Sequence, residues 1–221
     1  MEGISRETAV ETIERIVSAI ESDPMPVPVS ELWAYGDVVV GLDPVPRVEL
    51  YLSKDLLFKD NPAAEPAFEE SHGIAGVGKT VAADWARRFP QHLRGTDAGH
   101  ADPVRCLGAQ LLAPDQPVHL EVGNASFENS VRQRLGRARE SGDWERVLDP
   151  RAACLWATTE DGGQRSPDAL ERLRTGSVAV PTLARSLRML DVEETAIDAA
   201  TSAIGRSRDA GSGASVSGDI V

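Results

Sequence analysis

Residues 73–80 read GIAGVGKT, and this segment matches in full the GxxxxGK[ST] pattern of a phosphate-binding loop. Such a loop follows a buried parallel strand and opens a helix, so a true match would require a parallel α/β fold. The residues before it, PAAEPAFEESH, contain two prolines, three glutamates and a single large apolar residue. A central parallel strand is instead a nearly continuous run of Val, Ile and Leu. The sequence therefore argues against the fold that this loop normally needs.

The loop has a functional interpretation, in which backbone N–H groups surround the phosphates of ATP or GTP. The lysine would contact the phosphates and the hydroxyl of the last residue would hold Mg²⁺. A nucleotide hydrolase also needs a second apolar strand that ends directly in Asp, and no downstream segment has that pattern, so hydrolysis is disfavoured. The candidate phosphate-binding residues are Gly73, Gly76, Gly78, Lys79 and Thr80.

The alternative interpretation is a Gly-rich turn that enters a helix. The glycines then only permit positive φ angles, and Thr80 caps a short helix in which Val81, Trp85 and Phe89 share a face. Under this interpretation we expect no cofactor and no catalytic residue. A nucleotide with Mg²⁺ is expected only if the loop binds phosphate.

The charge balance indicates an acidic protein that does not bind nucleic acid. The chain of 221 residues has 35 acidic and 23 basic residues, a net charge of −12, and all but three of the basic residues are arginines. This pattern is typical of cytoplasmic proteins from halophiles, in which concentrated salt screens the repulsion between carboxylates; an ordinary acidic protein is the alternative. No signal peptide or membrane span is evident. We expect a cytoplasmic protein with no membrane contact.

The first part of the chain predicts one helix and one hairpin. Over residues 5–22, apolar residues recur at i, i+3, i+7 and i+10 from Val10, which indicates an amphipathic helix. Residues 31–58 predict a long antiparallel β-hairpin around the turn DPVP. In its second strand, RVELYLSKD, apolar and polar residues alternate, so we expect one buried face and one solvent-exposed face.

The remainder predicts an α+β fold with a mixed middle region and C-terminal helices. We expect a single domain over residues 1–204, helical from about 166, and a disordered tail over 205–221, because the tail is rich in Gly and Ser and lacks periodicity. The predicted elements are a helix over 103–112, a strand PVHLEV from Pro117, a helix capped by Ser126 and running to about 139, a strand over 153–157, and helices beginning near Ser166, Pro181 and Glu193.

The hairpin also resembles, in part, the signature of the nucleotidyltransferase superfamily. In that superfamily a Gly-Ser turn follows a strand, and two carboxylates one residue apart on the next strand hold two metal ions. Gly36 would be the turn glycine, Asp37 stands in place of the Ser, and Glu49 occupies one carboxylate position. Arg47 occupies the other position, where its charge would repel a metal ion. The resemblance therefore implies at most a degenerate domain without transferase activity, and the alternative is a two-stranded sheet edge with a polar outer face.

Other chemistry-bearing residues show no site pattern. The two cysteines lie far apart, and the four histidines lack the spacing of metal ligands, so we expect neither a disulfide nor a metal site. Arg132, Arg134, Arg137 and Arg139 fan across the solvent-facing arc of their helix, where we expect them to pair with acidic neighbours rather than to bind nucleic acid.

Three segments, ELWAYGDVVVGLDP, LYLSKDLLF and HGIAGVGKT, resemble those of a family of uncharacterised proteins from halophilic archaea. The resemblance extends from about residue 31 to 204 and implies no activity. The sequence thus favours a binding or interaction module, with a protein partner as one option, over an enzyme. The alternatives are a nucleotide-binding protein that uses residues 73–80 and a degenerate nucleotidyltransferase-like domain.

Overall fold

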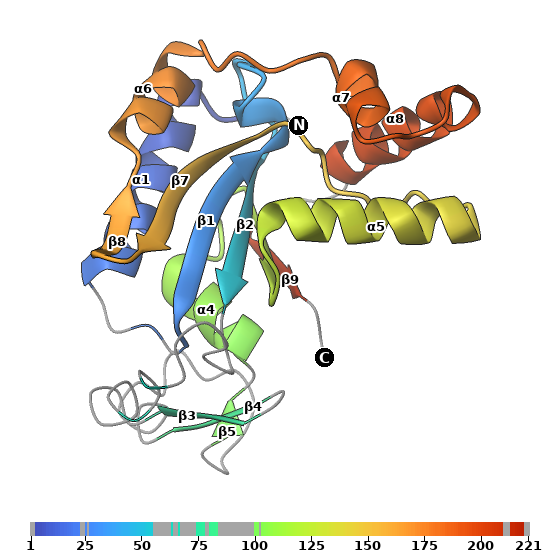
Figure 1. Cartoon of the computed structure of the whole chain (residues 1–221). Helices are drawn as coiled ribbons and strands as arrows, with labels where there is room; N and C mark the ends of the chain where they lie inside the picture. Colours follow the sequence, from blue (N-terminus) through green and yellow to red (C-terminus); the bar gives the residue numbers. More distant parts are fainter. Residues whose placement is uncertain are drawn as a thin grey trace.

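The structure is a computed structural model that describes residues 3–22, 25, 27–54, 103–209 and 213–218, with the short pieces 63, 66, 74–77, 80–83 and 100–101. These residues form the expected α+β fold, in which helices pack on both faces of a mixed six-stranded sheet (Figure 1). A separate antiparallel sheet consists of β3 (Ile74–Val77), β4 (Thr80–Ala83) and β5 (His100–Ala101).

The main sheet has the strand order β8-β7-β1-β2-β6-β9. The strands are β1 (Val29–Tyr35), β2 (Val48–Lys54), β6 (Val118–Gly123), β7 (Ala152–Thr159), β8 (Gly162–Arg165) and β9 (Ser215–Gly218). The antiparallel pairing of β1 with β2 confirms the predicted hairpin, although the connection is longer than the predicted turn and begins with the 3₁₀ helix η1 (Gly36–Val38). By contrast, β6 runs parallel to β2, and β9 runs parallel to β6.

One face of the sheet is covered by α1 (Arg6–Ser22), α4 (Pro103–Leu111) and α6 (Pro167–Thr175). The apolar residues that recur along α1 are buried, which confirms this helix and the face that it packs. Alternate residues of the strands, among them Leu32, Leu50 and Leu120, complete this core. Burial of such side chains is the main source of stability for this layer.

The opposite face is covered by α5 (Phe127–Ser141), α7 (Leu183–Met189) and α8 (Glu194–Asp209). Ser126 caps α5 as predicted, because its side chain accepts a hydrogen bond from the backbone N–H of Asn129 at 3.4 Å. Phe127 then packs into the sheet and stacks on Trp33, with 5.3 Å between the ring centroids. This contact fixes the start of α5 above β1.

The expectation of a solvent-exposed face on β2 is wrong, because every residue of this strand is buried. β2 lies in the middle of the sheet, and the helices of the second face cover its polar side chains. Tyr51, for example, donates a hydrogen bond to the backbone oxygen of Ala125 at 2.8 Å. The alternation of polar and apolar residues along β2 therefore corresponds to a polar face that is buried, not to a solvent-exposed face.

The predicted disordered tail is also wrong for part of its length. Helix α8 continues to Asp209, and β9 is hydrogen-bonded to β6 as the last strand of the sheet. Val216 packs against α4 at Gly108. Strands pair through hydrogen bonds between backbone N–H and C=O groups. A Gly- and Ser-rich segment also has these groups, so it can add a strand to the edge of a sheet. Among the residues described, no helix is both long enough and apolar enough to cross a bilayer.

Candidate functional site

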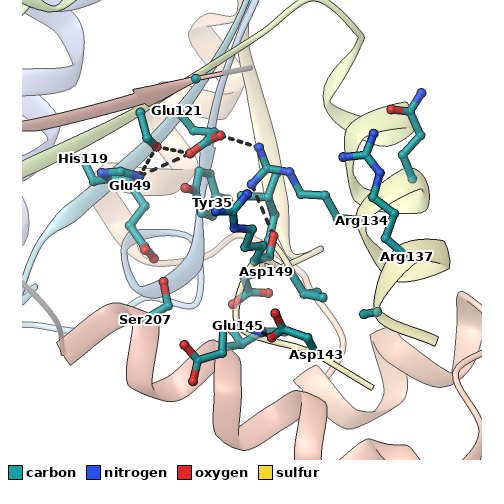
Figure 2. A pocket seen from close by; sticks show the side chains of 18 of the residues that line it. Tyr35, Glu49, His119, Glu121, Arg134, Arg137, Asp143, Glu145, Asp149 and Ser207 are labelled. Atoms are coloured by element: carbon teal, nitrogen blue, oxygen red, sulfur yellow. Dashed lines mark hydrogen bonds and ion pairs between the residues drawn. The ribbon is translucent and has the colours of Figure 1, made fainter. Parts of the chain in front are cut away.

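A pocket of about 920 Å³ opens on the second face of the sheet, between the strands, α5 and α8 (Figure 2). Its volume lies in the range of small-molecule sites. The register of the sheet brings the floor residues together, because Glu49 of β2 is opposite His119 of β6 and Glu121 of β6 is opposite Ser217 of β9. We call it the polar pocket; the lining residues considered below are Tyr35, Glu49, His119, Glu121, Arg134, Arg137, Asp143, Glu145, Arg146, Asp149, Ser207 and Ser217.

Glu121 is the best-connected carboxylate of the floor. It accepts hydrogen bonds from Arg134 of α5 and from Ser217 of β9, and one of its oxygens lies 3.5 Å from His119 Nε2. Burial by itself raises the pKa of this carboxyl, but the contacts with His119, Arg134 and Ser217 outweigh it and lower the pKa to about 2. Glu121 is therefore a charged and very weakly basic group at neutral pH.

A second buried carboxylate, Glu49, is held by an arginine of its own strand. The Arg47 Nη2 atom lies 3.3 Å from Glu49 Oε1, and the two residues are only 6% and 4% exposed. Arg47 also donates to the backbone oxygen of Ser207 in α8 at 2.9 Å. The guanidinium thus places a positive charge, not a second carboxylate, beside Glu49. Among the described residues, no group of three or more His, Cys, Asp or Glu side chains is arranged to hold a metal ion.

Asp149 is the third buried carboxylate, and it is paired with Arg151 through two hydrogen bonds. The distances are 3.0 Å from Arg151 Nε to Oδ1 and 2.7 Å from Nη2 to Oδ2. Bidentate pairs of this kind are among the strongest that arginine makes. Each buried carboxylate of the pocket therefore has its own arginine, and the floor is close to neutral in charge.

Tyr35 differs from these residues, because its hydroxyl makes no hydrogen bond to any described part of the chain. The side chain is 3% exposed and lines the pocket among Glu49, Glu121 and Arg134 (Figure 2). Burial and the negative charges of Glu49 and Glu121 raise the pKa of Tyr35 well above its ordinary value. The hydroxyl is therefore a neutral hydrogen-bonding group that faces the cavity.

Of the predicted phosphate-binding residues, Gly76 and Thr80 belong to the described part of the chain, and neither lines this pocket. Gly73, Gly78 and Lys79 lie outside the described residues, so the phosphate-binding loop stays a prediction. Gly76 lies in β3, and Thr80 begins β4, which pairs antiparallel with β3. The helix expected to begin at Thr80 is thus a strand over residues 80–83, where β-branched residues and cross-strand pairing outweigh the helical pattern.

Sequence reasoning did not bring the lining residues of the pocket together as one site. The spacing of the histidines indicates no site, and Arg134 is expected on the solvent-facing arc of its helix, yet His119 and Arg134 both contact Glu121. One part of the arginine prediction is confirmed, because Arg132 and Arg134 pair with acidic residues. The available signal was the polar alternation in β2 and in VHLEVG, which indicates a buried polar face once both strands are known to be internal.

Comparisons with other proteins add the family but no activity. No curated protein and no solved structure matches this chain. A family model does match, and it covers residues 5–221. The chain therefore belongs to the family of unknown function DUF7095.

Proposed function

We propose that this protein binds a small polar ligand in the polar pocket without catalysing a reaction on it. The observation that carries the proposal is the Tyr35 hydroxyl, a polar group in a residue 97% removed from solvent that faces the cavity and has no hydrogen-bonding partner in the described chain. The protein does not enclose this oxygen completely, because it opens onto the cavity, and a hydrogen bond between it and a ligand would contribute about 0.5–1.5 kcal/mol to binding.

Glu121 and Tyr35 are poorly suited to acid–base catalysis. A general base or acid works best with a pKa near the operating pH. The pKa of Glu121 is lowered to about 2, and that of Tyr35 is raised well above its ordinary value. Glu49 and Asp149 are each held in place by an ion pair with an arginine. Binding is therefore the function that these groups support.

The substitution Tyr35→Phe tests the proposal, with Tyr51→Phe as a matched control. Tyr35→Phe removes a hydroxyl that bonds to nothing in the described protein, so it should change stability by less than about 0.5 kcal/mol but weaken ligand binding about tenfold. Tyr51→Phe removes the hydroxyl that donates to the backbone oxygen of Ala125 and contacts the Ser130 hydroxyl, so it should cost about 1–3 kcal/mol of stability while binding persists.

The measurement begins with thermal-shift screening of the full chain against amino acids, sugars, carboxylates, phosphates, and ATP or GTP with Mg²⁺. Compounds that raise Tm are then titrated by calorimetry into both variants. A ligand that binds Tyr35→Phe as tightly as the unaltered chain would contradict the proposal, as would a panel without any binder. A nucleotide whose binding is lost in Lys79→Ala but kept in Tyr35→Phe would instead support the phosphate-binding loop.

A further inference from the structure

We propose that the ligand of the polar pocket is a small organic anion, bearing a carboxylate or a phosphate, that the guanidinium groups of Arg137 and Arg146 bind together with the Tyr35 hydroxyl. This inference rests on the proposed binding function and names the chemistry of its ligand. It requires no metal ion.

The charges that line the pocket are the first argument. Glu121 is paired with Arg134, Glu49 with Arg47, and Asp149 with Arg151. The remaining carboxylates are at the mouth, where Glu145 lies 3.6 Å from Arg206 and Asp143 accepts a backbone hydrogen bond. Among the described residues, the charges of the pocket without an ionic partner are the guanidiniums of Arg137 and Arg146 and the carboxylate of Asp143. This balance favours an anion.

The distribution of arginines across the molecule is the second argument. In this acidic chain, most arginines whose side chains are described pair with a carboxylate, a side-chain amide or a backbone oxygen. The exceptions in the described part are Arg137, Arg146, Arg172 and Arg185. Two of these four line the same pocket. Arg137 projects from α5 beside Arg134, on the side of the pocket opposite α8 (Figure 2).

The geometry also selects the form of the ligand. The two arginines are exposed at the mouth, whereas Tyr35 is buried at the floor. Guanidinium groups bind carboxylates and phosphates through paired hydrogen bonds, and a neutral phenol donates one more. A ligand that spans the pocket would therefore place its anionic group at the mouth and a hydrogen-bonding group against Tyr35.

The test compares two double variants that remove the same charge. Arg137→Gln/Arg146→Gln removes the two pocket guanidiniums that have no ionic partner in the described chain, and Arg172→Gln/Arg185→Gln removes two arginines that are also exposed but lie outside the pocket. The probes are inorganic phosphate, citrate, and glycerol 3-phosphate with glycerol as its neutral counterpart, titrated by calorimetry at constant ionic strength. We expect at least one anion to bind with a Kd that rises tenfold or more in the pocket variant and less than twofold in the control.

The possible results distinguish two claims, namely that the pocket binds a ligand and that this ligand is an anion. Equal losses in the two double variants would show a general charge effect and overturn it, as would the absence of binding by every anion. If neutral or cationic compounds bind in a Tyr35-dependent manner while the anions do not, the ligand class is wrong and the binding function stands. Binding of citrate alone, or of phosphate and glycerol 3-phosphate alone, supports the inference and identifies the anionic group.

Discussion

At the scale of single residues, Glu121 connects three elements of the fold. It lies on β6, and it accepts hydrogen bonds from Arg134 of α5 and Ser217 of β9. If one member of such a buried group of charges is removed, its partners stay buried without an opposite charge. The resulting loss of folding free energy is larger than the net contribution of the intact ion pair. This carboxylate therefore makes the stability of the fold sensitive to acid.

The pKa of Glu121 predicts in which direction stability changes with pH and over which pH range. The ordinary value is 4.5 and the folded-state value is about 2, so the folded chain binds the proton less tightly than the unfolded chain. The ionised Glu121 carboxylate therefore stabilises the fold fully above pH 4.5, and this stabilisation is lost as the pH falls towards 2. We expect the unaltered chain to have a higher free energy of unfolding than Glu121→Gln at pH 6. This difference should shrink by about 2 kcal/mol when the pH is lowered to 3.

Urea denaturation at the two pH values measures this difference. Glu128→Gln is the control, because Glu128 is exposed on α5 and lies 3.8 Å from Arg132, a pair that contributes little. It should change stability by only a few tenths of a kcal/mol at either pH. A difference for Glu121→Gln that stays constant with pH would show that its charge does not stabilise the fold.

At the scale of elements, β9 forms an edge of the main sheet and a wall of the polar pocket. Its Ser215 hydroxyl lies 2.9 Å from His119 Nδ1, and Val216 packs against α4. A chain that ends at Asp209 loses this strand. We expect its stability to fall by about 1–2 kcal/mol, or about 2–8 °C in Tm, because backbone hydrogen bonds and partly buried apolar surface are removed.

Calorimetric melting of the truncated and full chains measures the loss. A chain that ends at Gly218 keeps the whole strand and serves as the control, and it should melt with the full chain. If the chain that ends at Asp209 also melts unchanged, β9 does not stabilise the fold, and this prediction is wrong.

At the scale of the whole molecule, the net charge of −12 opposes compaction at low ionic strength. The Debye length falls from about 10 Å at 0.1 M salt to about 3 Å at 1 M, which screens repulsion between exposed carboxylates. We therefore expect Tm to rise from dilute buffer to molar KCl. A salt titration followed by circular dichroism measures the rise, and the same titration with sucrose controls for effects unrelated to charge. An unchanged Tm would contradict both the repulsion and a halophilic origin.

The sequence alone determined the elements whose signals are contiguous. Apolar periodicity from Val10 predicts α1, the side chain of Ser126 predicts the start of α5, and alternation in RVELYLSKD predicts a strand. These signals are local because side-chain periodicity and capping depend only on residues within a few positions of one another. The fold class and most helices of the described chain could therefore be predicted.

Only the tertiary structure decided which polar residues are buried and which of them meet. Glu121 and Ser217 are 96 positions apart, and they are neighbours because β9 takes a particular register beside β6. Likewise, β2 is internal only because β6 pairs along its second edge and helices from later in the chain cover its polar face. Strand order and register are set by the burial of many distant residues together, so no local pattern in the chain encodes the polar pocket.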